Sequence, residues 1–138
     1  MPYLLDTNIV SDIIRNPLGQ AAGRLRTLGI GQSCVSIVVS AELLYGAEEK
    51  NALQLTKRID EFLQTIRVVP LDEPADRIYA TIRAKLKKEG RIIGQNDLLI
   101  AAHALALDYT LVTDNDEEFA RVPGLRIENW LRRTRTGP

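Results

Sequence analysis

Short apolar runs that alternate with helix-patterned segments constrain the fold of this 138-residue chain more than any other feature. The clearest runs are residues 3–6, 34–39 and 110–113, which are aliphatic or β-branched and short enough to be buried strands. Two further short strands are expected at residues 66–69 and 125–127, the last at a sheet edge. Strands separated by helices favour βαβ units with a parallel sheet. We therefore predict an α/β fold, a three-layer α/β/α sandwich around a central parallel sheet of four to five strands.

Helical patterns fill the segments between these runs. They cover residues 9–15, 20–28, 40–46, 51–65, 73–89, 94–108 and 117–121. Thr7 or Asn8 is expected to cap the first of them, Ser40 to cap the third, and Gly90 to follow the end of the fifth. No linker or repeat divides the chain, so we expect one domain over residues 1–131 and a loose basic tail over 132–138.

Composition excludes several classes of protein. A hydrophobic fraction of 45% allows a real core, and a formal charge of zero gives no overall positive field to attract nucleic acid. The single cysteine, Cys34, excludes an internal disulfide and favours a reducing cytoplasm. No apolar run reaches the roughly 18–20 residues that span a bilayer, and no basic leader precedes Asp6, so neither a membrane span nor a signal peptide is expected. A single histidine, His103, excludes nuclease mechanisms that need two.

Acidic residues occur where the predicted strands end and the predicted helices begin. Strands of a parallel sheet all point to the same edge, where ligands bind, so these residues are expected to meet there. They are Asp6 after the first strand, Glu42 in the first turn of the third helix, Asp97 in the first turn of the sixth, and Asp114, Asn115 and Asp116 after the fourth strand. Clustered carboxylates repel one another unless a divalent cation lies between them. Each acid alone has an ordinary explanation as a helix cap, a dipole partner or a turn former, so the hypothesis of a shared site depends on their joint placement.

These residues lie in motifs that together make the chain resemble the PIN-domain ribonucleases, specifically the VapC-type toxins of bacterial toxin–antitoxin pairs. The resemblance covers nearly the whole chain. Its motifs are Leu4-Leu5-Asp6-Thr7-Asn8, Ser40-Ala41-Glu42-Leu43-Leu44-Tyr45-Gly46-Ala47, Ile93-Gly94-Gln95-Asn96-Asp97-Leu98-Leu99-Ile100-Ala101-Ala102-His103-Ala104, Leu111-Val112-Thr113-Asp114-Asn115-Asp116-Glu117-Glu118-Phe119 and Val122-Pro123-Gly124-Leu125.

The resemblance implies a metal-dependent endoribonuclease that cleaves RNA phosphodiester bonds, with Mg²⁺ as the cofactor and Mn²⁺ able to substitute. Asp6, Glu42 and Asp97 match the family's three acids. A fourth position falls on Asn115, with Asp114 and Asp116 as flanking alternatives, so that the catalytic set includes Asn115 and Asp116 and the metal set includes Asp114 and Asp116. Whether one or two ions bind stays open.

The resemblance also implies roles for neighbouring groups and for partners. Thr7, Asn8 and Thr113 are expected to orient the carboxylates or water. A cognate antitoxin, an RNA substrate with tRNA as one option, and a homodimer are implied. The helices expected over residues 9–28 and 51–65 are candidate walls for an antitoxin groove, although core packing explains the same apolar stripes.

A protein with no net charge needs local basic groups to bind the phosphates of RNA. The candidates are Arg83, Lys85, Lys87, Lys88 and Arg91, then Arg132, Arg133 and Arg135 in the tail, and finally Arg121 and Arg126. A solvated helix face and a loose end explain them equally well. His103 is expected to be a buried histidine with a hydrogen-bond partner rather than a metal ligand, and Tyr45 and Trp130 to be packing residues.

Two other functions compete with the nuclease. A magnesium-binding signalling receiver domain has a similar layout, and Asp72 after a strand could be its phosphorylated acid, but it also needs a late lysine and none follows Lys88. An inactive PIN-like module that only binds RNA is the second rival, and the complete set of acids argues against it.

Overall fold

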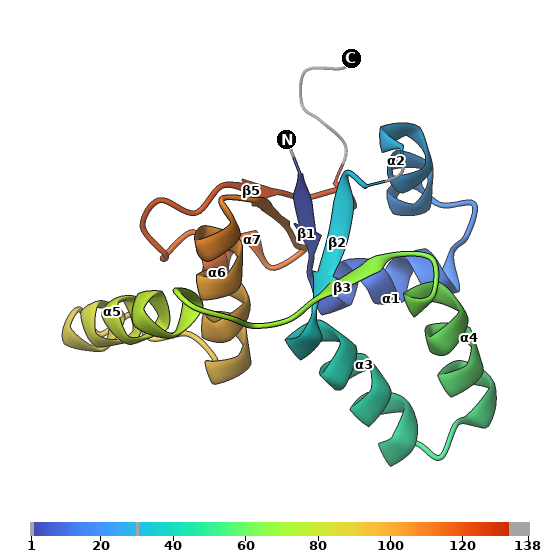
Figure 1. The fold of residues 1–138 in the computed structure, drawn as a ribbon, viewed down its shortest axis with the longest axis horizontal. Coiled ribbons are helices and arrows are strands. Elements are labelled where there is room, and N and C mark those ends of the chain that lie inside the picture. Colours follow the sequence, from blue (N-terminus) through green and yellow to red (C-terminus); the bar gives the residue numbers. More distant parts are fainter. Residues whose placement is uncertain (1, 30, 133–138) are drawn as a thin grey trace.

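The computed structural model describes residues 2–29 and 31–132, which fold around a five-stranded sheet with the order β3-β2-β1-β4-β5 (Figure 1). The strands are β1 (Tyr3–Leu5), β2 (Ser33–Ser36), β3 (Arg67–Val69), β4 (Thr110–Val112) and β5 (Ile127–Glu128). All neighbouring pairs are parallel. The predicted parallel sheet and the edge position of its last strand are therefore confirmed.

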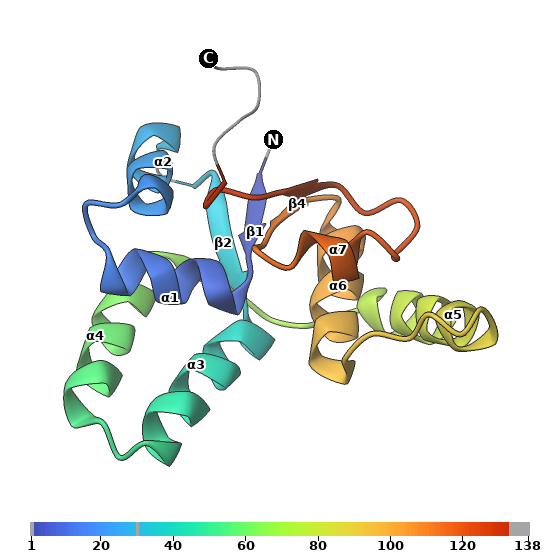
Figure 2. The same ribbon diagram turned by 180° about the vertical axis from the view of Figure 1, so that it is seen from behind.

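Helices cover both faces of this sheet. They are α1 (Thr7–Arg15), α2 (Gln20–Leu28), α3 (Ile37–Glu49), α4 (Leu53–Leu63), α5 (Ala75–Lys88), α6 (Gln95–Leu107) and α7 (Asp116–Phe119). Helix α6 lies in front of the sheet in Figure 1, whereas α1 lies in front when the molecule is seen from behind in Figure 2. This arrangement confirms the three-layer α/β/α sandwich. The pair α3 and α4 extends beyond the carboxyl ends of the strands (Figure 1).

The core centres on β1, β4 and α6. Leu4, Leu5, Leu111 and Val112 are fully buried, as expected for central strands covered on both faces. Helix α6 packs against α5 as well as the sheet, which explains why it is apolar on almost every side. Asp6 and Thr113 follow the two buried strands directly, so polar side chains emerge at the carboxyl edge from a rigid base.

The boundary between β2 and α3 differs from the prediction. The strand ends at Ser36 instead of residue 39, and the β-branched residues that follow begin the helix. Ser36 Oγ accepts a hydrogen bond from the Val38 N–H at 3.1 Å, so Ser36 is the cap and the prediction of Ser40 was wrong. Capping at Ser36 outweighs the strand preference of the residues behind it. Glu42 consequently lies in the second turn of α3, not the first.

The first helix also begins earlier than predicted. Asp6 is its N-cap, with Oδ1 accepting from the Thr7 N–H at 2.8 Å, so the assignment of the cap to Thr7 or Asn8 was wrong. The fifth helix ends as predicted, because Gly90 follows it with a φ of +68° that an L side chain rarely adopts. Helix α4 is shorter than the predicted 51–65, and its first residue, Leu53, is 81% exposed rather than part of the apolar face.

The two aromatic residues predicted to pack behave differently. Trp130 is buried and its ring meets Tyr3 edge-on at 5.4 Å between centroids, which confirms the prediction. Tyr45 is 64% exposed, and its hydroxyl donates to Glu49 at 2.9 Å, so its assignment as a packing residue was wrong. It lies on the solvent side of α3, where the helix has no neighbour to pack it against in the described chain.

The end of the chain is only partly described. Arg132, predicted to begin a loose tail, forms an ion pair with Asp116 at 3.1 Å. The rest of the predicted tail, including Arg133 and Arg135, lies outside the described residues. A single domain over residues 1–131 stays a prediction. No helix among the described residues is long and apolar enough to cross a membrane.

Candidate active site

Asp6 is held in place by both central strands. It is only 4% exposed, and while Oδ1 accepts from the Thr7 N–H, Oδ2 accepts from the Thr113 hydroxyl at 2.7 Å. Burial raises the pKa of Asp6, the two hydrogen bonds oppose this effect, and the charges of Glu42 and Glu118 add to it. The net result is a raised pKa, which means that the carboxylate is fixed in a position where its charge is costly.

Glu42 reaches the same edge from the second turn of α3. Its Oε1 accepts from the Thr7 hydroxyl at 2.7 Å, and its Oε2 accepts from Asn96 Nδ2 at 3.4 Å. Thr7 therefore donates to two carboxylates, its N–H to Asp6 and its hydroxyl to Glu42. These contacts connect the beginnings of α1 and α6 with the middle of α3.

Asp97 has the most perturbed carboxyl group of the site. It is half-buried in the first turn of α6, and burial, followed by the charges of Asp6, Glu118 and Glu42, raises its pKa to about 7. A hydrogen bond with Glu118 acts in the same direction. The structure thus brings together Asp6, Glu42 and Asp97. These residues are far apart in sequence, but their charges act on one another.

Glu118 is a member of this group that sequence reasoning missed. From α7, its Oε1 accepts from the Gly94 N–H at 3.0 Å, and its Oε2 accepts from Asn115 Nδ2. These bonds lower its pKa, the Gly94 bond most of all. A Cβ atom at Gly94 would lie 3.8 Å from Asp97 Oδ2 and 3.9 Å from Glu118 Oε1, so both carboxylates border one small space. Helical spacing could have found Glu118, since it lies one turn after Asn115 on the same face.

The turn after β4 places its acids elsewhere. Asp114 Oδ1 accepts from Asn129 Nδ2 at 3.0 Å, and its N–H donates to Asn8 Oδ1 at 3.2 Å. Asp116 accepts from Asn129 at 3.3 Å and pairs with Arg132. Neither is among the charges that raise the pKa of Asp6 or Asp97. Asp114 and Asp116 therefore face β5 and the C-terminal segment.

Asn115 sits between these two acids but turns inward. Its N–H donates to the Thr113 hydroxyl at 3.0 Å, and its amide group donates to Glu118. The same Thr113 hydroxyl donates to Asp6, so a chain of hydrogen bonds runs from Asn115 to Asp6. Asn115 thus contacts a carboxylate of the group without adding a charge to it.

The four carboxylates form an open group instead of a closed cage. Within residues 2–29 and 31–132, none of them has a Lys or Arg ion pair, and no three Asp, Glu, His or Cys side chains converge tightly enough to enclose an ion. Oxygen-only donors in an open arrangement suit Mg²⁺, which takes one or two carboxylates and keeps several waters. They do not suit a structural zinc site, which needs four close ligands.

The predicted RNA-contacting residues of α5 lie away from this group, on a helix that projects from the side of the molecule (Figure 1). Arg83 contacts Tyr79, with its guanidinium 5.7 Å from the ring centroid, and Lys85 pairs with Glu89 at 2.9 Å. Lys87, Lys88 and Arg91 are exposed. Nothing in their placement distinguishes a phosphate-binding surface from a solvated helix face.

Two other arginines suggested for RNA are engaged with the protein's own groups. Arg121 donates to the Ile92 carbonyl at 3.1 Å, and Arg126 donates to the Asp108 carbonyl while pairing with its carboxylate at 3.0 Å. The Arg126–Asp108 ion pair is largely exposed, so it contributes little to stability.

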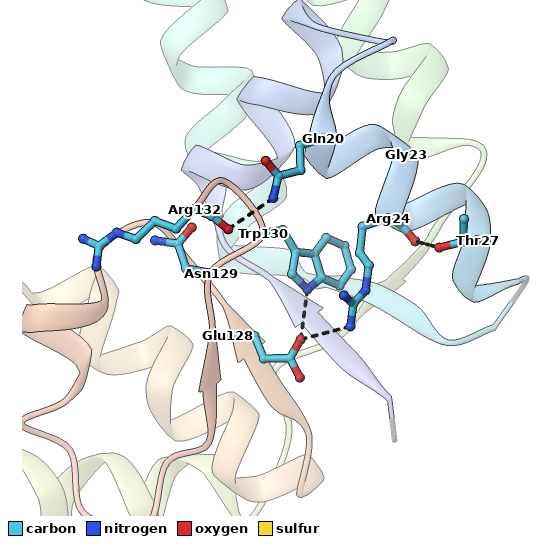
Figure 3. Close-up of a pocket in the computed structure, with 8 residues that line it drawn as sticks. All are labelled: Gln20, Gly23, Arg24, Thr27, Glu128, Asn129, Trp130 and Arg132. Carbon is cyan, nitrogen blue, oxygen red and sulfur yellow. Dashed lines mark hydrogen bonds and ion pairs between the residues drawn. The ribbon is translucent and has the colours of Figure 1, made fainter. Parts of the chain in front are cut away.

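A separate hollow of about 530 Å³ lies between α2 and the segment after β5 (Figure 3). Arg24 lies over the Trp130 ring at 5.8 Å and 3.6 Å from Glu128, while Gln20 donates to the Arg132 carbonyl at 3.1 Å. Its two cationic side chains, Arg24 and Arg132, both face carboxylates of the same protein. This hollow therefore has no uncompensated positive charge with which to hold a phosphate.

Comparison with known proteins identifies the family of the chain. A family profile described as PIN domain matches residues 3–125. Ribonuclease VapC2 of Rickettsia felis is 39% identical over 132 residues, covering 94% of this chain and 98% of the relative. The tRNA(fMet)-specific endonuclease VapC of Shigella flexneri is 38% identical over 134 residues, again covering 94% and 98%. A crystal structure of VapBC2 from Rickettsia felis bound to a promoter DNA fragment superposes with a TM-score of 0.87 at 37% identity, over 94% of this chain and 99% of that one. The chain therefore belongs to the PIN-domain family and, within it, to the VapC group.

Proposed function

We propose that the protein is the toxin of a toxin–antitoxin pair and acts as a metal-dependent endoribonuclease. The observation that carries this proposal is the group of four carboxylates from four segments, in which Asp97 has a pKa of about 7. Such a group is unfavourable by itself and becomes favourable when a divalent cation is bound. The names of the VapC relatives, ribonuclease and endonuclease, support the same reaction class.

We propose Mg²⁺ as the cofactor, with Mn²⁺ as a substitute, held by Asp6, Glu42 and Asp97. Glu118 is a better candidate than Asp114 or Asp116 for the fourth carboxylate, because it borders the same space as Asp97. When bound, the ion supplies a site that activates water for attack on a phosphodiester. One ion or two would satisfy this requirement.

The remaining polar residues have positioning roles in this proposal. Thr113 and Thr7 fix both oxygens of Asp6, and Thr7 also fixes one oxygen of Glu42. Because these bonds orient the carboxylates before substrate arrives, less reorganisation is needed during the reaction. Asn8 holds the backbone of the turn at Asp114, and Asn115 holds Glu118.

Cleavage of RNA by the purified protein, freed of any partner, tests the proposal. We expect cleavage with Mg²⁺ or Mn²⁺ that EDTA abolishes, and at least a roughly hundredfold slower rate for Asp6→Asn, about 3 kcal/mol of barrier. Asp60→Asn, which removes an exposed acid from α4, is the matched control and should cleave normally. Cleavage that persists in both EDTA and Asp6→Asn would overturn the mechanism.

The same preparation discriminates the rival functions. RNA binding without cleavage would indicate an inactive binding module. An acyl phosphate formed from a small phosphodonor would indicate a receiver domain. Membership of the chain in the PIN-domain family gives no support to a receiver function.

We further propose that an antitoxin binds a groove of about 450 Å³ between α1, α3 and α4. Glu42 and Thr7 lie at one end, and Ile14, Leu43 and Leu55 supply apolar walls. The α1 and α4 walls were predicted from sequence, whereas α2 does not line this groove. A segment lying here would reach the carboxylates, where a basic side chain could replace the cation.

Gly46 offers a way to test this partner. It lines the groove, and a Cβ atom added there would meet nothing within 4 Å. Gly46→Gln should therefore fill the groove without disturbing the core. We expect this variant to keep its cleavage activity and to lose inhibition by its cognate antitoxin. Unchanged inhibition would exclude this groove.

Three finer expectations complete the proposal. A tRNA substrate is suggested by the name of the Shigella flexneri relative, and a homodimer by the resemblance to VapC-type toxins. A reducing cytoplasm suits a chain whose single cysteine, Cys34, is a buried free thiol. Sequencing of RNA ends after brief expression in cells would identify the substrate.

A further inference from the structure

His103 is a titratable side chain that is almost completely buried and has no part in the carboxylate group. It is 1% exposed in the middle of α6, about 240° around the helix from Asp97. Its Nδ1 lies 2.8 Å from Ser36 Oγ, which confirms the expectation of a buried histidine with a hydrogen-bond partner. Because Ser36 lies at the beginning of α3, this hydrogen bond connects α6 with α3.

Ser36 makes a second hydrogen bond in addition to its contact with His103. It is fully buried, ends β2, and caps α3 by accepting from the Val38 N–H. Since its oxygen accepts this bond, its hydroxyl proton is available to donate to Nδ1 of a neutral imidazole. Burial lowers the pKa of His103, against the opposing effects of the Pro70 carbonyl and Asp72, which keeps the ring in that neutral form.

The two hydrogen bonds between α3 and α6 have matching positions. Ser36 contacts His103, and Glu42 contacts Asn96, so the two helices run in roughly opposite directions and are inclined to each other (Figure 1). Ser36 precedes Glu42 by six positions, and Asn96 precedes His103 by seven. At 1.5 Å per residue, the two contacts lie about 9 Å apart along α3 and about 10.5 Å apart along α6. The pair is therefore fixed at two points.

We propose that the Ser36–His103 hydrogen bond is a positioning contact that sets the separation of the Glu42 and Asp97 carboxylates. The contact at Asn96 is long, at 3.4 Å, and exposed, so it cannot fix the helices by itself. The contact at His103 is short and buried, where a hydrogen bond is stronger and its geometry better defined. Loss of it frees α3 to shift along α6, and this shift moves Glu42 relative to Asp97.

The inference rests on the proposed function, because it concerns the affinity of the carboxylates for a divalent ion. The experiment measures Mn²⁺ binding by isothermal titration calorimetry, in the full chain and without RNA. We expect His103→Leu, which keeps the volume but removes the hydrogen bond, to weaken Mn²⁺ binding by about tenfold. His103→Asn, which keeps a polar atom near the position of Nδ1, should restore at least half of the loss on a logarithmic scale.

Two comparisons separate positioning from general destabilisation. Ile82→Val, a buried change on α5, a helix that carries neither contact, should lower the melting temperature while leaving Mn²⁺ affinity unchanged. Ser36→Ala and His103→Leu should not be additive in their effect on Mn²⁺ affinity, because both remove the same bond. If His103→Leu does not fold, Ser36→Ala and Ser36→Thr test the same contact, the threonine retaining the hydroxyl.

Each outcome bears on the inference. Mn²⁺ affinity that is unchanged in His103→Leu and Ser36→Ala, or that falls equally in Ile82→Val, would overturn the positioning role while leaving the proposed nuclease intact. Failure of the wild-type protein to bind Mn²⁺ would overturn both proposals together.

Discussion

Two groups of acids lie near each other at the carboxyl edge of the sheet, and the chain compensates only one of them. The outer pair, Asp114 and Asp116, receives hydrogen bonds from Asn129, and Asp116 also pairs with Arg132. The inner cluster consists of Asp6, Glu42, Asp97 and Glu118. It receives hydrogen bonds from hydroxyl, amide and backbone groups, yet none of its members has an ion pair within the described chain.

Under the proposed function, the difference shows how a chain prepares a cation site. Neutral donors orient the inner carboxylates without cancelling their charge, and repulsion and burial raise the pKa of Asp97 to about 7. The outer pair resembles an ordinary surface, where a turn is stabilised by nearby polar groups. An acidic sequence segment alone therefore does not identify a cation site. What distinguishes the two groups is whether a cationic side chain of the same protein neutralises the carboxylates.

Exchanging one acid in each group should produce the largest contrast. Asp97→Asn removes a carboxylate of the inner cluster and should slow RNA cleavage by at least about a hundredfold, whereas Asp116→Asn should change the rate by less than about threefold. The measurement is the initial rate of RNA cleavage at saturating Mg²⁺. Equal losses in the two variants would erase the distinction between the groups.

Glu118 sharpens the boundary of the inner cluster. Glu118→Gln keeps the shape but removes the charge next to Asp97, so we expect about tenfold weaker Mn²⁺ binding, or roughly 1.4 kcal/mol. Glu117→Gln, a neighbouring exposed acid on the same short helix, is the control and should bind normally. Calorimetric titration with Mn²⁺ distinguishes the two variants. A wild-type affinity in Glu118→Gln would show that Glu118 is not the fourth carboxylate and would favour the turn after β4 for that position.

The stability of the metal-free protein should depend on Asp97 in a defined direction. Its folded pKa of about 7 lies above its ordinary value of 3.8, so between these values the folded state binds more protons than the unfolded state. Stability should therefore fall as the pH rises from about 4 to 7. Asp97→Asn should flatten this fall and add about 1 kcal/mol at pH 7.5, a value reduced for the half-exposed side chain.

Urea unfolding in EDTA between pH 5 and 7.5 measures this effect. Added Mg²⁺ should stabilise the wild-type protein more than Asp97→Asn, since the ion relieves the same repulsion. A metal-free wild-type stability that rises with pH over this range would contradict the assignment.

The smallest effect is expected in the outer pair. Arg132→Gln removes an exposed ion pair with Asp116, which should change the free energy of unfolding by less than about 0.5 kcal/mol. It should also leave Mn²⁺ binding unchanged. A tenfold loss of Mn²⁺ affinity in this variant would show that Arg132 acts on the inner cluster through Asp116.

Much of the fold was predictable because its signals are local. The apolar run of α6 and the short aliphatic strands gave the parallel sheet, and the rule that parallel strands share a carboxyl edge brought Asp6, Glu42 and Asp97 together. The boundary at Ser36 was not predictable from propensity, because the following β-branched residues favour a strand by themselves. Their helical conformation depends on the cap at Ser36 and on packing against α6.

Glu118 was not predicted from the sequence, for a different reason. Motif matching directed attention to the turn after β4, where three polar residues are adjacent in sequence. In the structure, Asp114 of this turn contacts Asn129, and Glu118 of α7 accepts a hydrogen bond from the Gly94 N–H. That contact joins residues 24 positions apart, and neither composition nor spacing within the turn reports it. The burial of His103 was expected, but its partner Ser36 depends on the packing of two helices.

Anomalous diffraction from crystals soaked in Mn²⁺ tests the central claim most directly, because it locates the ion without reference to activity. The account predicts a difference peak at the inner cluster, within about 2.5 Å of oxygens from Asp6 or Asp97, and no peak of similar height at the outer pair. A peak between Asp114 and Asp116, with none beside Asp6 and Asp97, would contradict it.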